Sequence, residues 1–113
     1  MPIEKWSDQV NVVRLNDDPQ FTDDLQQLQE QLERNAASSV LDFSAVQFVN
    51  SSNISHLLRL RKQAISGDLK LILCGMATQL WGTFLSTGLD QVFEFSDNVT
   101  TALATLQING SAE

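Results

Sequence analysis

Short apolar runs alternate along this chain with longer stretches in which apolar residues recur every three or four positions. A short run rich in Val, Ile and Leu predicts a buried strand. Apolar residues that recur every three or four positions predict a helix with one buried face. Helices that connect successive strands return the chain across the sheet, so such strands run parallel. The pattern therefore predicts an α/β domain with a mostly parallel or mixed sheet of about four or five strands, flanked by about four helices.

The predicted strands are apolar and rich in β-branched residues. Val10–Leu15 is the first clear run, and Ile3–Gln9 is expected to pair with it as an edge. Residues 46–49 either continue the strand at 39–43 or follow a turn at Ser44–Ala45. Further strands are expected at 69–74 and 91–95.

Four helices are predicted from their apolar faces and caps. Asp18 and Pro19 suit the N-cap and first position of the first helix, and Asp97 is expected to cap the last one. Arg61 falls inside an apolar arc, and we expect its guanidinium in solvent or on a carboxylate. The expected buried faces are Phe21, Leu25, Leu28 and Leu32; Ile54, Leu57, Leu58, Leu60, Ala64 and Ile65; Ala77, Leu80, Trp81, Phe84 and Leu85; and Val99, Ala102, Leu103 and Leu106.

Composition limits the size of the fold and the class of partner. A chain of 113 residues that is 42% hydrophobic fits one domain, expected at residues 1–108 with a flexible tail at 109–113. Fourteen acidic against seven basic residues give a net charge of -7, which repels phosphate backbones, so no nucleic-acid partner is expected. No run approaches the length of a membrane span and the start lacks signal-peptide features, which predicts a cytoplasmic protein without membrane insertion. A monomer is expected when the protein is free.

Patterns for catalysis and metal binding are sparse. The chain has one His, one Cys and no Gly-rich phosphate loop, so we expect no metal and no cofactor. A triad of Ser51, His56 and Asp42 is disfavoured, because five residues on one helix turn His56 about 140° away from Ser51. We therefore expect no enzymatic activity. Cys74 lies in an apolar run, which predicts a buried thiol rather than a reactive one.

The segment Asn-Ser-Ser-Asn at 50–53 lies where a strand-like run stops and a helix begins. Its Asn-x-Ser tripeptides would matter for glycosylation only in a secreted chain. Ser51 or Ser52 can accept a backbone N–H of the first helical turn as the N-cap. Capping alone would explain the two serines.

Two long segments nevertheless resemble one family. "VLDFSAVQFVNSSNISHLLRLRKQA", residues 40–64, resembles the central motif of the STAS domain of bacterial anti-sigma factor antagonists: a strand, Asp-x-Ser, an apolar pair, and a Ser-Ser pair at a helix start. Residues 69–103 resemble the family's next strand, third helix, Thr-Gly-Leu-Asp turn, and closing strand and helix. The similarity covers the chain from Val10 to Leu106.

The resemblance implies a phosphorylation switch. Such antagonists bind an anti-sigma factor that is also a serine kinase, and phosphorylation breaks the complex. Carried onto this chain, the phosphoacceptor is Ser51, with Ser52 as the alternative, and Asp42 and Ser44 match the Asp-x-Ser segment. The partner-binding residues expected from the resemblance are Asn50, Ser51, Ser52, Asn53, Ser55, His56 and Arg59.

Two positions at the motif differ from the family's usual residues. The family commonly has Asp before the acceptor serine and Gly after the pair, where this chain has Asn50 and Asn53. Asn50 can still form hydrogen bonds but carries no negative charge. A second hypothesis therefore stays open: a STAS adaptor that is not phosphorylated and docks constitutively on a transporter ATPase or a signalling assembly.

Overall fold

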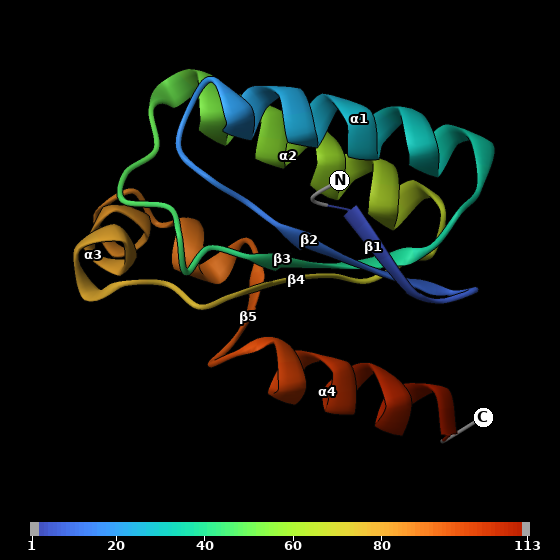
Figure 1. Ribbon diagram of the computed structural model, residues 1–113. Helices are drawn as coiled ribbons and strands as arrows, with labels where there is room; N and C mark the ends of the chain where they lie inside the picture. The colour runs from blue at the N-terminus through green and yellow to red at the C-terminus, as the bar shows by residue number, and fades with distance from the viewer. Residues whose placement is uncertain (1–2, 112–113) are drawn as a thin grey trace.

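The computed structural model describes residues 3–111, which form one α/β domain (Figure 1). The predicted class, strand number and helix number are confirmed within these residues. The elements are β1 (Ile3–Ser7), β2 (Val10–Arg14), α1 (Gln20–Arg34), β3 (Ser38–Asp42), α2 (Ser51–Ser66), β4 (Leu71–Cys74), α3 (Thr78–Ser86), the 3-10 turn η1 (Leu89–Gln91), β5 (Glu94–Ser96) and α4 (Val99–Ser111).

The five strands form a single mixed sheet in the order β1-β2-β3-β4-β5. β1 pairs antiparallel with β2 at the edge, as predicted, and β2 to β5 run parallel. Each parallel step is made through one of the helices α1, α2 and α3, as a short connection could not return the chain. Residues 46–49 are not a strand: the chain turns at Ser44–Ala45 and then rises toward α2.

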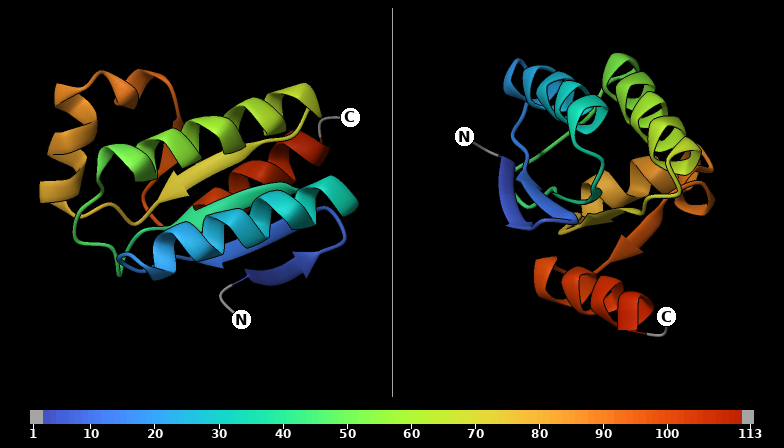
Figure 2. Two further views of the ribbon diagram at one scale, coloured as in Figure 1. Left: turned by 90° about the horizontal axis from the view of Figure 1, so that it is seen from above. Right: turned by 90° about the vertical axis from the view of Figure 1, so that its right-hand side faces the viewer.

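Helices cover both faces of this sheet. α1 and α2 lie side by side over one face and α4 lies under the other, while α3 sits at one end (Figures 1 and 2). Successive side chains of a strand point to opposite faces, so each strand contributes to two cores. Val13, Leu41 and Leu73 belong to the larger core, and Val12, Val40 and Ile72 to the smaller one with Ala102 of α4.

Helix α1 confirms its predicted face, since Phe21, Leu25, Leu28 and Leu32 are all buried. In α2 and α3 the buried face is narrower than predicted, because some of the apolar residues assigned to it are exposed. Leu58 and Ile65 of α2 are 39% and 58% exposed, and Leu85 of α3 is also exposed. The arc of apolar residues is wider than the strip that each helix presses against the rest of the domain.

Three local predictions need correction or remain open. Asn98, not Asp97, caps α4, because its Oδ1 accepts the Thr101 N–H at 2.8 Å. Arg61 Nε donates to the backbone carbonyl of Val92 at 2.8 Å, and no carboxylate within residues 3–111 pairs with this partly exposed side chain. α4 extends to Ser111, residues 112 and 113 lie outside the described residues, and the flexibility of 109–113 remains a prediction. Across residues 3–111, no helix combines the length and the apolar character of a membrane span.

Candidate functional site

The N-terminal end of α2 is held by two asparagines. The Asn53 N–H donates to Asn50 Oδ1 at 2.8 Å, and the Asn50 N–H donates to Asn53 Oδ1 at 3.0 Å. This reciprocal pair is a capping box, here built from Asn at both positions. The prediction that Ser51 or Ser52 caps the helix is therefore wrong.

Asp18 connects this cap to helix α1. Its Oδ2 accepts from Asn53 Nδ2 at 2.8 Å and from Asn50 Nδ2 at 3.4 Å. Its Oδ1 accepts from the Thr22 N–H at 3.0 Å and the Thr22 hydroxyl at 2.8 Å. One carboxylate thus fixes the starts of both helices, and Asp18 contributes to capping α1 although Pro19 occupies the cap position.

These contacts also favour the charged form of Asp18. The hydrogen bond from Asn53 is the main cause that lowers the pKa of Asp18; burial opposes it, and the bonds from Thr22 and Asn50 add to the lowering. Asn53 itself is only 2% exposed, so its side-chain amide forms its hydrogen bonds with other residues of the protein and not with water. The Asn53 side chain thus holds the helix terminus, and its contact with a partner stays a prediction.

With the asparagines as caps, the two serines are left free. Ser51 and Ser52 are exposed in the first turn of α2, and neither hydroxyl has a hydrogen-bond partner within residues 3–111. Their backbone N–H groups are at the helix terminus, where intrahelical acceptors are lacking. The helix start therefore offers two unengaged hydroxyls beside backbone donors, an environment that favours an anion.

The remaining predicted residues extend this surface along α2. Ser55 and Arg59 are exposed, and His56 is half-buried. Ser51, Ser55 and Leu58 follow one another at spacings of four and three, so they share one outward line on the helix. The structure thus brings the predicted residues together on one helix, with Asn53 on its inner side.

One largely exposed aromatic residue at this site is not among the predicted site residues. Phe48 lies in the connection just before α2 and is 68% exposed, the largest exposed fraction among the large apolar side chains of the described residues. The apolar residues around it predict a possible strand at 46–49. The signal that could have identified it is an aromatic residue two positions before a polar helix cap, in a segment already suspected to follow a turn.

Asp42 and Ser44 have a structural role at the end of β3. Asp42 Oδ1 accepts from the Ser44 N–H at 3.0 Å and the Ser44 hydroxyl at 2.8 Å, and its Oδ2 lies 3.2 Å from Arg14 Nη1. This turn redirects the chain from the sheet toward α2. Across the described part of the chain, no hydrogen bond joins Asp42 to Ser51 or His56.

Neither thiol chemistry nor metal binding is evident at this end of the sheet. Cys74 is buried, and burial, reinforced by the Asp42 charge, raises the pKa of its thiol to about 12. Among residues 3–111, no three potential ligands from His, Cys, Asp and Glu lie together. The α2 terminus, with its free serines, is the candidate site.

Comparisons with known proteins match most of the chain. The family model of the STAS domain matches residues 7–102. A putative anti-sigma factor antagonist from Thermotoga maritima is 14% identical, with 94% of this chain and 93% of that chain covered and a TM-score of 0.83. A chain of the stressosome, a signal integration and transduction hub, is 26% identical over 96% of this chain and 98% of its own, with a TM-score of 0.75.

A third solved structure comes from Bacillus. It is the cell fate determinant SpoIIAA in its phosphorylated form, which is 16% identical over 92% of this chain and 96% of its own, with a TM-score of 0.72. Likenesses at identities this low show the fold alone. No curated protein sequence matches the chain significantly.

Proposed function

The chain belongs to the STAS domain family, and from this premise we propose that it is an anti-sigma factor antagonist. In this proposal it binds a serine-kinase-type anti-sigma factor through the N-terminal end of α2 and loses that partner when Ser51 is phosphorylated, with Ser52 as the alternative acceptor. Proteins of the same fold described as an anti-sigma factor antagonist and as a phosphorylated cell fate determinant support it. It is a regulatory protein, not an enzyme, in this proposal.

The observation that carries the proposal is that the two asparagines, and not the two serines, cap α2. Ser is a leading cap residue, so two serines at this position could have served the fold alone. Here Asn50 and Asn53 perform the capping, and the serine hydroxyls point to solvent without a partner within residues 3–111. A kinase can therefore reach a hydroxyl whose modification breaks no bond of the native structure.

The charges at this terminus explain how such a switch acts. A phosphoserine adds a charge of about -1.5 to -2, and the helix N-terminus stabilises an anion by about 0.3–1 kcal/mol. The Asp18 carboxylate, bound to both asparagines, repels it in part. The two effects oppose each other, so the fold is retained while a partner packed over this terminus has to desolvate a bulky dianion.

The proposed partner surface combines an apolar anchor with small polar groups. Phe48 supplies a largely exposed ring, and Ser51, Ser55 and Leu58 continue the surface along α2. Aromatic anchors of this type commonly dominate binding energy at protein interfaces. The net charge of -7 favours a partner with basic contacts, through faster association.

Binding measurements on matched variants test this proposal. The affinity for the serine-kinase anti-sigma factor of the same cell is measured for wild type, Ser51→Asp and Ser55→Asp, which add the same charge one helical turn apart. We expect Ser51→Asp to weaken binding at least tenfold, about 1.4 kcal/mol, and Ser55→Asp to weaken it less. Equal affinities for wild type and Ser51→Asp would show that a negative charge at Ser51 does not control binding of the anti-sigma factor.

A second candidate function is a constitutive adaptor in a signalling assembly. The likeness to a stressosome chain favours it, as does the neutral Asn50 in place of an acidic residue. In that case the partner binds wild type, Ser51→Ala and Ser51→Asp with the same affinity, and Phe48→Ala weakens all three complexes. The same titrations therefore separate the two candidates.

A further inference from the structure

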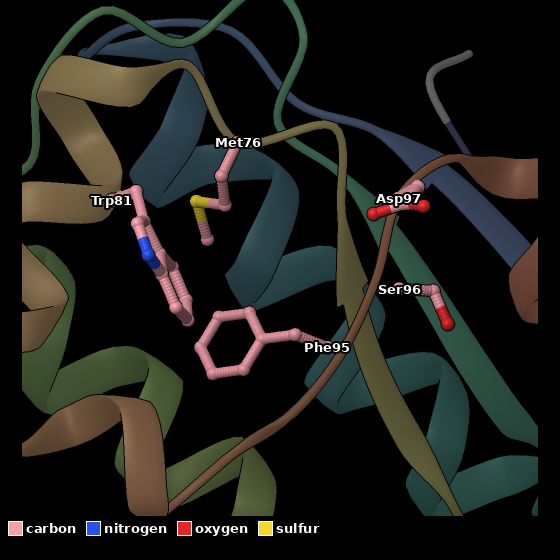
Figure 3. A pocket seen from close by; sticks show the side chains of 5 residues that line it. All are labelled: Met76, Trp81, Phe95, Ser96 and Asp97. Carbon is pink, nitrogen blue, oxygen red and sulfur yellow. The ribbon is translucent and has the colours of Figure 1, made fainter.

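A cavity of about 390 Å³ opens where β4 and β5 end, beside helix α3 (Figure 3). Its lining residues are Met76, Trp81, Phe95, Ser96 and Asp97. Cavities of about this volume accept small ligands, and the carboxyl ends of parallel strands are a common place for them. None of these residues belongs to the α2 terminus.

One wall of the cavity is aromatic. The rings of Trp81 and Phe95 meet edge to face, with centroids 4.8 Å apart and planes at 80°. Figure 3 shows Met76 directed toward the same space, on the side of β5 that carries these two rings. All three side chains are only partly buried, so ring and thioether surface remains open to a ligand.

The opposite rim is polar and acidic. Both Ser96, the last residue of β5, and Asp97 line the cavity; Ser96 points away from the two rings, whereas the Asp97 carboxylate lies across the segment that leads to α4 (Figure 3). Asp97 is exposed, and none of the five lining residues is basic. Together with a net charge of -7 on the chain, this rim disfavours anions such as phosphates and carboxylates.

We propose that this cavity binds a small organic cation: an ammonium group on an apolar, preferably aromatic, body. The body packs against Trp81, Phe95 and Met76, and the ammonium group lies toward the acidic rim at Asp97. Aromatic faces attract cations, and thioethers pack well against rings. A half-open site of this size gives weak, millimolar binding of a fragment-sized ligand.

Three probes that share a ring and differ in charge test the proposal: benzylammonium, benzyl alcohol and benzoate. The protein has two tryptophans, so Trp6→Phe leaves Trp81 as the only one and makes its fluorescence a reporter of the cavity. We expect saturable changes with benzylammonium, with an affinity about two- to fivefold higher than for benzyl alcohol. Benzoate should bind more weakly than either.

Two variants in the Trp6→Phe protein assign the preference to the cavity. Asp97→Asn, an exposed and conservative change, should remove much of the preference for benzylammonium over benzyl alcohol. Leu85→Ala, on an exposed face of α3 outside the cavity lining, should leave all affinities unchanged. Thermal melts of each variant verify that it is folded.

Several results would overturn the proposal. They are an absence of saturable change with any probe, benzoate binding as tightly as benzylammonium, or an unchanged charge preference in Asp97→Asn. An equal effect of Leu85→Ala would likewise place binding outside the cavity.

Discussion

Replacing Asp18 by Ala should destabilise the protein far more than its exposed position suggests. Asp18 is the acceptor that the starts of α1 and α2 share. Its loss leaves Asn53 Nδ2, in a side chain that is 2% exposed, with only the Thr22 hydroxyl at 3.4 Å. It also removes the acceptor of the Thr22 N–H in the first turn of α1.

The expected magnitude follows from these two losses. A lost cap costs about 1 kcal/mol, and a buried donor without a good acceptor costs about 1–3 kcal/mol. We expect a total of about 2–4 kcal/mol at pH 7. For 113 residues the unfolding entropy is about 0.24 kcal/mol/K, so the melting temperature should fall by about 8–17 °C.

A double-mutant cycle isolates the central contact. Asp18→Ala, Asn53→Ala and the double variant are compared by urea unfolding followed by circular dichroism. We expect a coupling energy of about 1–2 kcal/mol between Asp18 and Asn53, because each single variant already breaks their shared bond. Asp23→Ala is the matched control, since Asp23 is exposed in the same turn of α1 and should cost under about 0.5 kcal/mol.

The pH dependence gives the same contact a second test. The pKa of Asp18 is lowered in the folded protein, so its contribution is fully present above the unfolded pKa of about 3.9 and is lost as pH falls through the folded value. The difference between wild type and Asp18→Ala should be constant from about pH 7 to pH 5 and shrink in more acid solution. Additive single variants, or an Asp18→Ala effect no larger than that of Asp23→Ala, would refute the reasoning.

Four further predictions concern the end of β4 and the helices α1 and α3. Gly75→Ala should destabilise by more than about 1 kcal/mol in chemical denaturation, because Gly75 has a φ of +74° and a Cβ there would lie 2.6 Å from Asp42 Oδ1. Gly82→Ala, where a Cβ meets nothing within 4 Å on a helix, should instead stabilise by about 0.5–1 kcal/mol. Cys74 should not react with iodoacetamide at pH 8 until the protein unfolds, because its pKa is about 12; rapid native alkylation would contradict this. Asp24→Asn should raise stability at pH 7 but not at pH 3, since burial and Asp23 raise the pKa of Asp24; an equal effect at both pH values would contradict it.

The sheet and its helices could be predicted because their signals are local. Val10–Leu15 and residues 69–74 have apolar runs that a helix or loop does not explain, and the spacing from Phe21 to Leu32 fits a helix alone. Leu58 and Ile65 belong to the apolar arc of α2 but are exposed. Periodicity identifies an apolar arc, but which part of it is covered depends on where neighbouring elements lie.

The candidate site could be located from sequence, but its construction could not. Ser and Asn are both good N-caps, so residue preference could not decide between Ser51 and Asn50. The deciding contact comes from Asp18, which is 35 residues before Asn53 in the chain. The two asparagines that looked like departures from the family pattern are the residues that fix this terminus.

The residues of the aromatic cavity could also be assigned to their elements from sequence, whereas the cavity itself could not be predicted. The sequence assigned Trp81 to the apolar face of a helix and Phe95 to a strand, and both assignments hold. Their shared cavity depends on β5 pairing with β4, a tertiary relation that no local pattern contains.

The measurement that tests the central claim most directly is the position of phosphate on the protein. The purified chain is incubated with ATP and the serine-kinase anti-sigma factor of the same cell, and fragment-ion mass spectrometry distinguishes Ser51, Ser52 and Ser55. We predict one phosphate on Ser51, or on Ser52 in the Ser51→Ala variant, and none on Ser55. An active kinase that leaves both Ser51 and Ser52 unmodified would contradict the proposal that the free serines of α2 form a switch.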